Sequence, residues 1–131
     1  MIRLAIVKGP ELFLFRTQDP GKTMMAGVEI LGASRRRLGV ISFTVKNMHY
    51  DVVVKTLNDR YGIQTRGGCS CAGTYGHVLL GIDEGRSYEI LRSLRAGEMW
   101  RKPGWVRLSI HPTMTDDEIG YIMDALVCVT R

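Results

Sequence analysis

The segment from Trp105 to Leu126 restricts the fold of this chain more than any other part of the sequence. Its first six residues alternate between apolar residues on one face and other residues, Arg107 among them, on the opposite face, as in a β-strand with one buried side. A capping box from Thr115 to Glu118 then opens an apolar stripe at helical spacing, formed by Ile119, Ile122, Met123 and Leu126. A strand followed closely by an amphipathic helix predicts a domain in which sheet and helix share one core.

The middle of the chain carries the same two patterns. Strands are predicted over 28–32 and 38–45, and a helix is predicted from an N-cap at Asn47 to a stop at Gly62. Two more helices are expected, one over 72–82 packed on the sheet and one over 87–96 with three apolar residues turned inward, namely Ile90, Leu91 and Leu94.

The order of these elements indicates an α+β fold: a small mixed or antiparallel sheet with helices packed on one face. We expect one domain over residues 28–131. Residues 1–27 show no sustained periodicity, so no structure is assigned to them.

Length and composition exclude several classes of protein. A chain of 131 residues with 45% apolar and 24% charged residues suits a single globular core, and it lacks the composition of a disordered protein. The net charge of +5 is a weak indication of an anionic partner. No stretch approaches the roughly 20 apolar residues of a membrane span, so no membrane partner is expected. Three cysteines, two of them separated by a single residue, favour the reducing cytoplasm over a secreted disulfide framework.

Two features of the sequence are candidates for a catalytic or binding site. The loop from Arg66 to Gly73 combines a cation, glycines and thiols, and because a nearby guanidinium favours the thiolate, Cys71 is a candidate nucleophile. The alternative is a cysteine buried in a tight turn, since free cysteine is among the most buried residue types. Arg107 can hold a carboxylate through two parallel hydrogen bonds, or it can be a solvated surface residue.

Metal and nucleic-acid sites are weaker alternatives. Cys69 and Cys71 with His77 or His111 would offer zinc ligands, but structural zinc sites space their cysteines more widely, so no metal is expected. The basic run over 35–37 has no interleaved aromatic residues, so no nucleic-acid partner is expected.

Four motifs together resemble one known family: the strand Leu38 to Phe43, the helix His49 to Ile63, the loop Arg66-x-Gly68-x-x-Cys71-Ala72, and the strand Val106 to Ser109 with the helix that follows it. They are similar to the C-terminal domain of class V aminotransferases, the fold-type I pyridoxal-phosphate enzymes that include the cysteine desulfurases. The resemblance extends from Val28 to Leu126. It implies the small α+β domain of those enzymes.

The resemblance implies a role for each candidate residue. Cys71 matches the cysteine with which desulfurases take sulfur from the substrate as a persulfide. Arg107 matches the arginine that grips the substrate carboxylate, and Arg66, which opens the loop, would support that contact. Another reaction on an amino acid within the same superfamily stays open, because Cys69-Ser70 precedes Cys71 where desulfurases usually carry histidine or another bulky polar residue.

The resemblance also implies partners. In the family, a larger domain holds pyridoxal phosphate through a lysine, and none of the five lysines here lies in a similar motif. We therefore expect a fragment or stand-alone small domain, inactive alone, which binds no cofactor stably but meets an amino-acid substrate and a large cofactor-binding domain. Pairing with itself as a homodimer is a further expectation. A non-catalytic interaction module of the same fold is the main alternative, and a thiol redox or zinc protein is a third.

Overall fold

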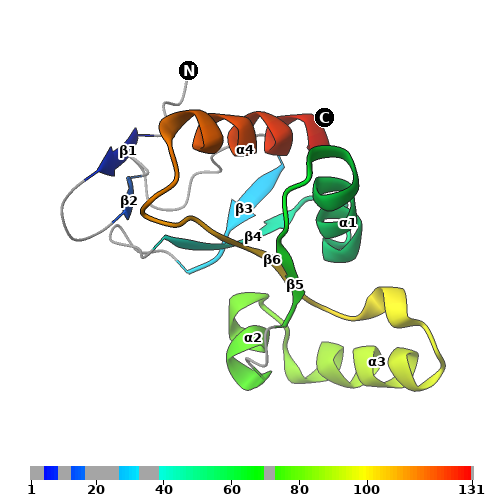
Figure 1. Cartoon of the computed structure of the whole chain (residues 1–131). Coiled ribbons are helices and arrows are strands. Elements are labelled where there is room, and N and C mark those ends of the chain that lie inside the picture. The colour runs from blue at the N-terminus through cyan, green and yellow to red at the C-terminus, as the bar shows by residue number, and fades with distance from the viewer. Residues whose placement is uncertain (1–4, 9–12, 17–26, 33–38, 70–72, 131) are drawn as a thin grey trace.

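The computed structural model describes residues 5–8, 13–16, 27–32, 39–69 and 73–130 (Figure 1). Its centre is a four-stranded antiparallel sheet in the order β3 (Val28–Ile30), β4 (Val40–Val45), β6 (Trp105–Ser109) and β5 (Arg66–Gly68). Two more strands, β1 (Ala5–Lys8) and β2 (Phe13–Arg16), pair in a separate antiparallel sheet within the segment that had no predicted structure. The α+β fold with a small antiparallel sheet is confirmed.

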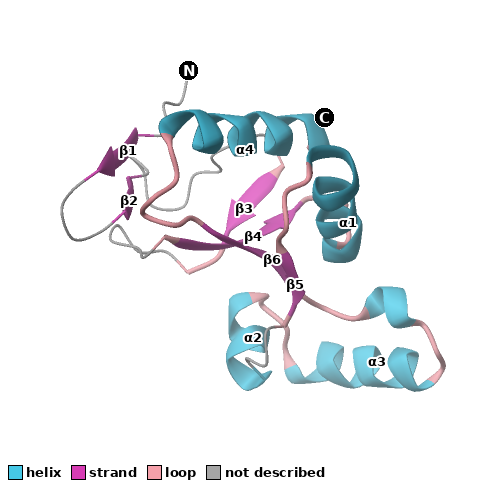
Figure 2. Cartoon of the chain, in the orientation of Figure 1, coloured by secondary structure: helices cyan, strands magenta, loops and turns pink. Residues whose placement is uncertain are grey.

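Helices α1 (Tyr50–Tyr61) and α4 (Asp116–Val129) lie on one face of this sheet (Figure 2). The strand register explains why, because it sets Ile41 opposite Leu108 and Phe43 opposite Val106, so that one face is continuously apolar. Onto this face α1 packs its most deeply buried residues, Val53 and Leu57, and α4 packs its apolar stripe of Ile119, Ile122, Ala125, Leu126 and Val129. Each fully buried aliphatic side chain contributes about 2 kcal/mol to this core.

The end of α1 and the start of α4 follow the local signals in the sequence. The capping box is confirmed: the backbone N–H of Glu118 donates to Oγ1 of Thr115 at 3.2 Å, and the backbone N–H of Thr115 donates to Oε2 of Glu118 at 2.7 Å. Helix α1 ends at Gly62, whose φ of 65° is in the left-handed region that glycine adopts without strain.

The prediction of Asn47 as the N-cap of α1 is wrong. The N-cap is His49, whose ring nitrogen Nδ1 accepts a hydrogen bond from the backbone N–H of Asp51 at 3.3 Å. Asn47 has a φ of 59° and belongs to the turn before the helix, a conformation that asparagine tolerates better than most residues.

Helices α2 (Gly73–Leu79) and α3 (Glu84–Arg95) and the 3₁₀ turn η1 (Met99–Arg101) lie beyond the end of β5, apart from α1 and α4 (Figure 1). Both helices were predicted, but the packing predicted for them is wrong: the first was expected to pack on the sheet and the second to turn Ile90, Leu91 and Leu94 inward. The side chains of Tyr75 and Val78 on α2 are 61% and 71% exposed, and α3 contains no buried residue, so its apolar residues are not turned into a core. An amphipathic pattern indicates that one face can be covered, but it does not identify what covers it.

The pair Gly67-Gly68 falls in the segment predicted from the sequence to be a loop, yet it forms β5 together with Arg66. Close packing explains the choice of glycine, because a Cβ atom on Gly67 would lie 2.7 Å from Cδ2 of Tyr50. Gly68 has a φ of 110°, which is open only to glycine.

Candidate functional site

Arg107 lies on the sheet face turned away from α1 and α4, as the alternation of its strand predicts. Its neighbours Val106 and Leu108 are buried in the core, so the side chain between them points to the opposite face. The register sets Arg107 directly opposite Ser42 on β4 and Arg66 on β5. Residues paired in this way stand on the same face with Cβ atoms about 5 Å apart. The sheet therefore places a hydroxyl and two guanidiniums in one row.

No described carboxylate neutralises this row. The ion pairs recorded among the described residues involve other side chains, and neither Arg66 nor Arg107 takes part in one. The Nε atom of Arg107 is buried and has no hydrogen-bond partner in the described part of the chain. An unpaired donor on a half-buried cation is costly unless an anion meets it, and the planar guanidinium fits a carboxylate with two parallel hydrogen bonds.

Trp105 lies on the same sheet face as Arg107, and it was not named from the sequence as a candidate site residue. It lies two residues before Arg107 on β6, so both side chains are on the same face, although Trp105 is only 4% exposed. Its indole Nε1 atom is buried without a partner among the described residues. The alternation indicated an outward tryptophan, but only the three-dimensional surroundings show that this N–H group is buried and unpaired.

Cys71 lies outside the described residues, as does the basic run over 35–37. The structure therefore does not place the Cys71 thiol relative to Arg107. Arg66 and Arg107, the other two candidates, are brought together across β5 and β6.

Cys69, in the same loop, has a structural role. Its thiol donates a hydrogen bond to the backbone carbonyl of Pro103 at 2.8 Å. Burial raises the pKa of the Cys69 thiol, and the positive charge of Lys102 offsets part of that rise. The protonated thiol fixes the end of β5 against the segment that leads into β6.

His49 links the same segment to α1. Its Nδ1 atom accepts the N–H of Asp51, so Nε2 carries the proton and donates to the carbonyl of Lys102 at 3.1 Å. The ring is thus held in a single tautomer by two backbone groups. The bond to Asp51 is local, but the bond to Lys102 joins residues that are 53 positions apart, so no local pattern identified the whole contact set of this histidine.

Within the described residues, no three histidine, cysteine or acidic side chains lie close enough together to hold a metal ion. Cys69, His77 and His111 therefore do not form a zinc set with one another.

The described lysines do not fit the site that pyridoxal phosphate needs, an enclosed lysine amine surrounded by donors for a phosphate. Lys46, Lys55 and Lys102 are all exposed, and Nζ of Lys55 is 3.0 Å from a carboxylate oxygen of Asp59. The side chains of Lys8 and Lys22 are not among those described.

The comparison with known families gives one result. The family model described as Aminotransferase class-V matches residues 23–122, which is more than half of the chain, and the chain belongs to that family. A comparison with curated proteins gives no match. Intact members of this family use pyridoxal phosphate and act on amino acids. In the described part of the chain, no helix is both long enough and apolar enough to span a membrane.

Proposed function

We propose that this chain is the C-terminal, substrate-covering domain of a class V aminotransferase-like enzyme. In this role the domain binds the carboxylate of the amino-acid substrate, and a large domain binds pyridoxal phosphate. The main support is the pairing of Arg107 with Arg66 on a sheet face where no carboxylate of the described residues is their partner. A substrate carboxylate would neutralise charge there and occupy the unpaired Nε of Arg107.

We further propose cysteine desulfuration as the reaction, with Cys71 as the sulfur acceptor. Gly68 is directly opposite Trp105, two residues from Arg107, and Cys71 follows Gly68 by three residues. Three residues of chain span at most about 10 Å, so the sequence separation from Gly68 is short enough for Cys71 to reach the arginine row. In net terms, the carbon–sulfur bond of cysteine breaks, its sulfur atom joins the Cys71 thiolate as a persulfide, and the carbon gains a proton to give alanine. Pyridoxal phosphate supplies the electron sink for such chemistry when it is bound.

Sulfide release from cysteine by the cofactor-loaded enzyme that contains this chain tests the reaction. Cys71→Ser should abolish release in the presence of a thiol reductant, because the acceptor thiolate is lost. Cys128→Ser, which changes an exposed cysteine on α4, is the control and should leave release unchanged. Full sulfide release by the Cys71 variant would reject Cys71 as the sulfur acceptor. If the enzyme acts on a different amino acid instead of cysteine, the proposed arginine site stands and the proposed reaction is wrong.

A second experiment tests the division into two domains on the chain itself. After incubation with pyridoxal phosphate and reduction with borohydride, peptide mass spectrometry should find no lysine modified in clear preference to the others. A stoichiometric adduct on one defined lysine would mean that this chain carries the cofactor site, and the domain assignment would then be wrong.

A non-catalytic interaction module is the second candidate, and the surface of α2, α3 and η1 favours it. Tyr88, Met99 and Trp100 are 69%, 58% and 66% exposed, and Tyr75, Val78 and Leu91 on α2 and α3 are exposed as well. Apolar surface of this kind commonly marks an interface, with a second copy or with a separate large domain. Sedimentation should show self-association or binding of that domain, whereas a clean monomer under all conditions would argue against this candidate.

The cytoplasmic location expected from cysteine usage is also a proposal. It is supported by Cys69 and Cys128, which are both free thiols.

A further inference from the structure

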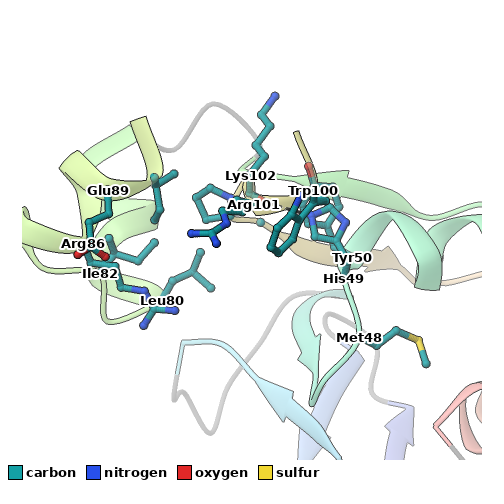
Figure 3. A pocket seen from close by; sticks show the side chains of 13 residues that line it. Met48, His49, Tyr50, Leu80, Ile82, Arg86, Glu89, Trp100, Arg101 and Lys102 are labelled. Atoms are coloured by element: carbon teal, nitrogen blue, oxygen red, sulfur yellow. Dashed lines mark hydrogen bonds between the residues drawn. The ribbon is translucent and has the colours of Figure 1, made fainter. Parts of the chain in front are cut away.

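A groove of about 520 Å³ lies between α3 and the segment that leads into β6 (Figure 3). The wall on the side of α3 carries three half-buried aliphatic side chains: Leu80, Ile82 and Ile90. The opposite wall carries three rings: His49, Tyr50 and Trp100. Small-molecule sites in proteins have volumes of about 300–1,000 Å³, so this groove has the size of a ligand site.

The ring wall is held in place before any ligand arrives. The two hydrogen bonds of His49 fix its ring, whose centre is 4.2 Å from the centre of the Tyr50 ring. Tyr50 in turn is wedged between two glycines, since a Cβ atom would lie 2.7 Å from its ring at Gly67 and 2.6 Å at Gly104. A ligand would therefore meet a preformed aromatic surface at little cost in ordering.

Positive charge is present on both sides of the groove. Arg86 comes from α3 and Arg101 from η1, whereas Lys102 points away from the α3 wall in the close view (Figure 3). Glu98 contacts Nε of Arg101 at 3.0 Å, and the same guanidinium lies 4.8 Å from the centre of the Trp100 ring, so its direction is fixed. Arg86 forms no ion pair with another described residue. Glu89 is the single carboxylate in the described lining.

We propose that this groove binds a small organic anion with a flat apolar body, such as an aromatic carboxylate. The body lies between the aliphatic wall and the rings, and the anionic group meets Arg86 and Arg101. An inorganic anion would leave the apolar walls unused, and a neutral aromatic compound would leave Arg86 without an anionic partner among the described residues. The groove includes neither Arg66 nor Arg107, so this inference goes beyond the proposed function and does not depend on it.

Titration of the full chain with 2-naphthoate, followed by backbone amide shifts in NMR spectra, tests this site. Two probes separate its parts: 2-naphthalenemethanol has the body without the charge, and inorganic phosphate has the charge without the body. Naphthoate should give saturable shifts at Trp100, Arg101 and Gly104. It should bind about fivefold or more tightly than either of the other probes, because only naphthoate uses both walls and both cations.

Arg86→Gln should weaken naphthoate binding about fivefold, in proportion to the loss of one partly screened charge contact. Arg92→Gln is the matched control, an exposed arginine on the same helix outside the groove lining, and it should leave the affinity unchanged. Arg86 is exposed, so its replacement keeps the fold, which the same spectra verify.

Three results would overturn the proposal. Shifts that do not saturate, or that occur elsewhere, would mean that no site exists in the groove. Equal affinity for the neutral compound would mean that the arginines do not contribute to binding, and the assignment of an anionic ligand would be wrong. Equal effects of the Arg86 and Arg92 variants would reduce the binding to general attraction by a basic surface.

Discussion

At the scale of single residues, the arrangement of Arg66 opposite Arg107 carries a cost in stability that can be measured. Like charges directly opposite on neighbouring strands are destabilising, and no described carboxylate relieves this pair. Arg66→Gln should therefore raise the free energy of unfolding by about 0.5 kcal/mol at low salt. The gain should vanish at high salt, where screening already weakens the repulsion.

Chemical denaturation at two salt concentrations checks this prediction, with Arg92→Gln as the control that should show no salt-dependent gain. A loss of stability in the Arg66 variant would mean that Arg66 has an acidic partner, which contradicts the arrangement described here.

Cys69 gives a second prediction at this scale. Because burial raises its pKa and its proton is held by the carbonyl of Pro103, Cys69 should react with iodoacetamide about fivefold or more slowly than the exposed Cys128. A raised pKa also means that the folded state binds the proton more tightly than the unfolded state, so this contribution to stability is lost as the pH rises through the folded-state pKa. Peptide mass spectrometry distinguishes the three cysteines, and equal rates for Cys69 and Cys128 would refute the hydrogen-bonded, buried thiol.

At the scale of elements, the close contact between the start of β6 and the end of β5 depends on glycine. A Cβ atom on Gly104 would lie 2.6 Å from the Tyr50 ring and 2.7 Å from Cα of Gly68, so Gly104→Ala should cost about 2 kcal/mol of unfolding free energy. Gly120→Ala, the same change in the middle of α4 with nothing within 4 Å, should stabilise the protein by about 1 kcal/mol. Thermal or denaturant unfolding measures both, and two changes of the same sign would contradict this packing.

Much of the fold at this scale is readable from local sequence. The capping box of α4, the glycine stop of α1 and the alternation in β4 and β6 all act within a few residues, so each was predicted. The N-cap of α1 was misassigned because His49 is fixed partly by the carbonyl of Lys102, far along the chain. Likewise, β5 has the composition of a turn and is a strand because it pairs with β6 and lies against Tyr50.

At the scale of the whole molecule, the described helices divide into two groups. Helix α1 packs its buried residues on the sheet, whereas α3 has the same length of 12 residues and no buried residue. Since tertiary packing supplies most helical stability, the amides of α3 should exchange with solvent at least about 100-fold faster than the slowest amides of α1. Hydrogen exchange followed by NMR tests this directly, and equal protection of the two helices would show that α3 is covered in solution.

The candidate site could be predicted only in part, for a reason that belongs to this scale. The outward direction of Arg107 follows from the period of its own strand, but its position opposite Arg66 depends on the register between β5 and β6, which no local pattern encodes. The groove is built from three separate chain segments, so Arg86 and Trp100 showed no relation to each other in the sequence. The family match explains why the motifs occur together, but it does not test the role of each residue.

The central claim is that Arg107 holds the carboxylate of an amino-acid substrate, and steady-state kinetics of the cofactor-loaded enzyme containing this chain test it most directly. Arg107→Gln should raise KM about 100-fold, the effect expected when a charged pair of hydrogen bonds is lost, and Arg107→Lys should recover part of the loss. Arg92→Gln should leave KM unchanged. A KM for the Arg107→Gln enzyme equal to that of the unaltered enzyme would contradict the claim.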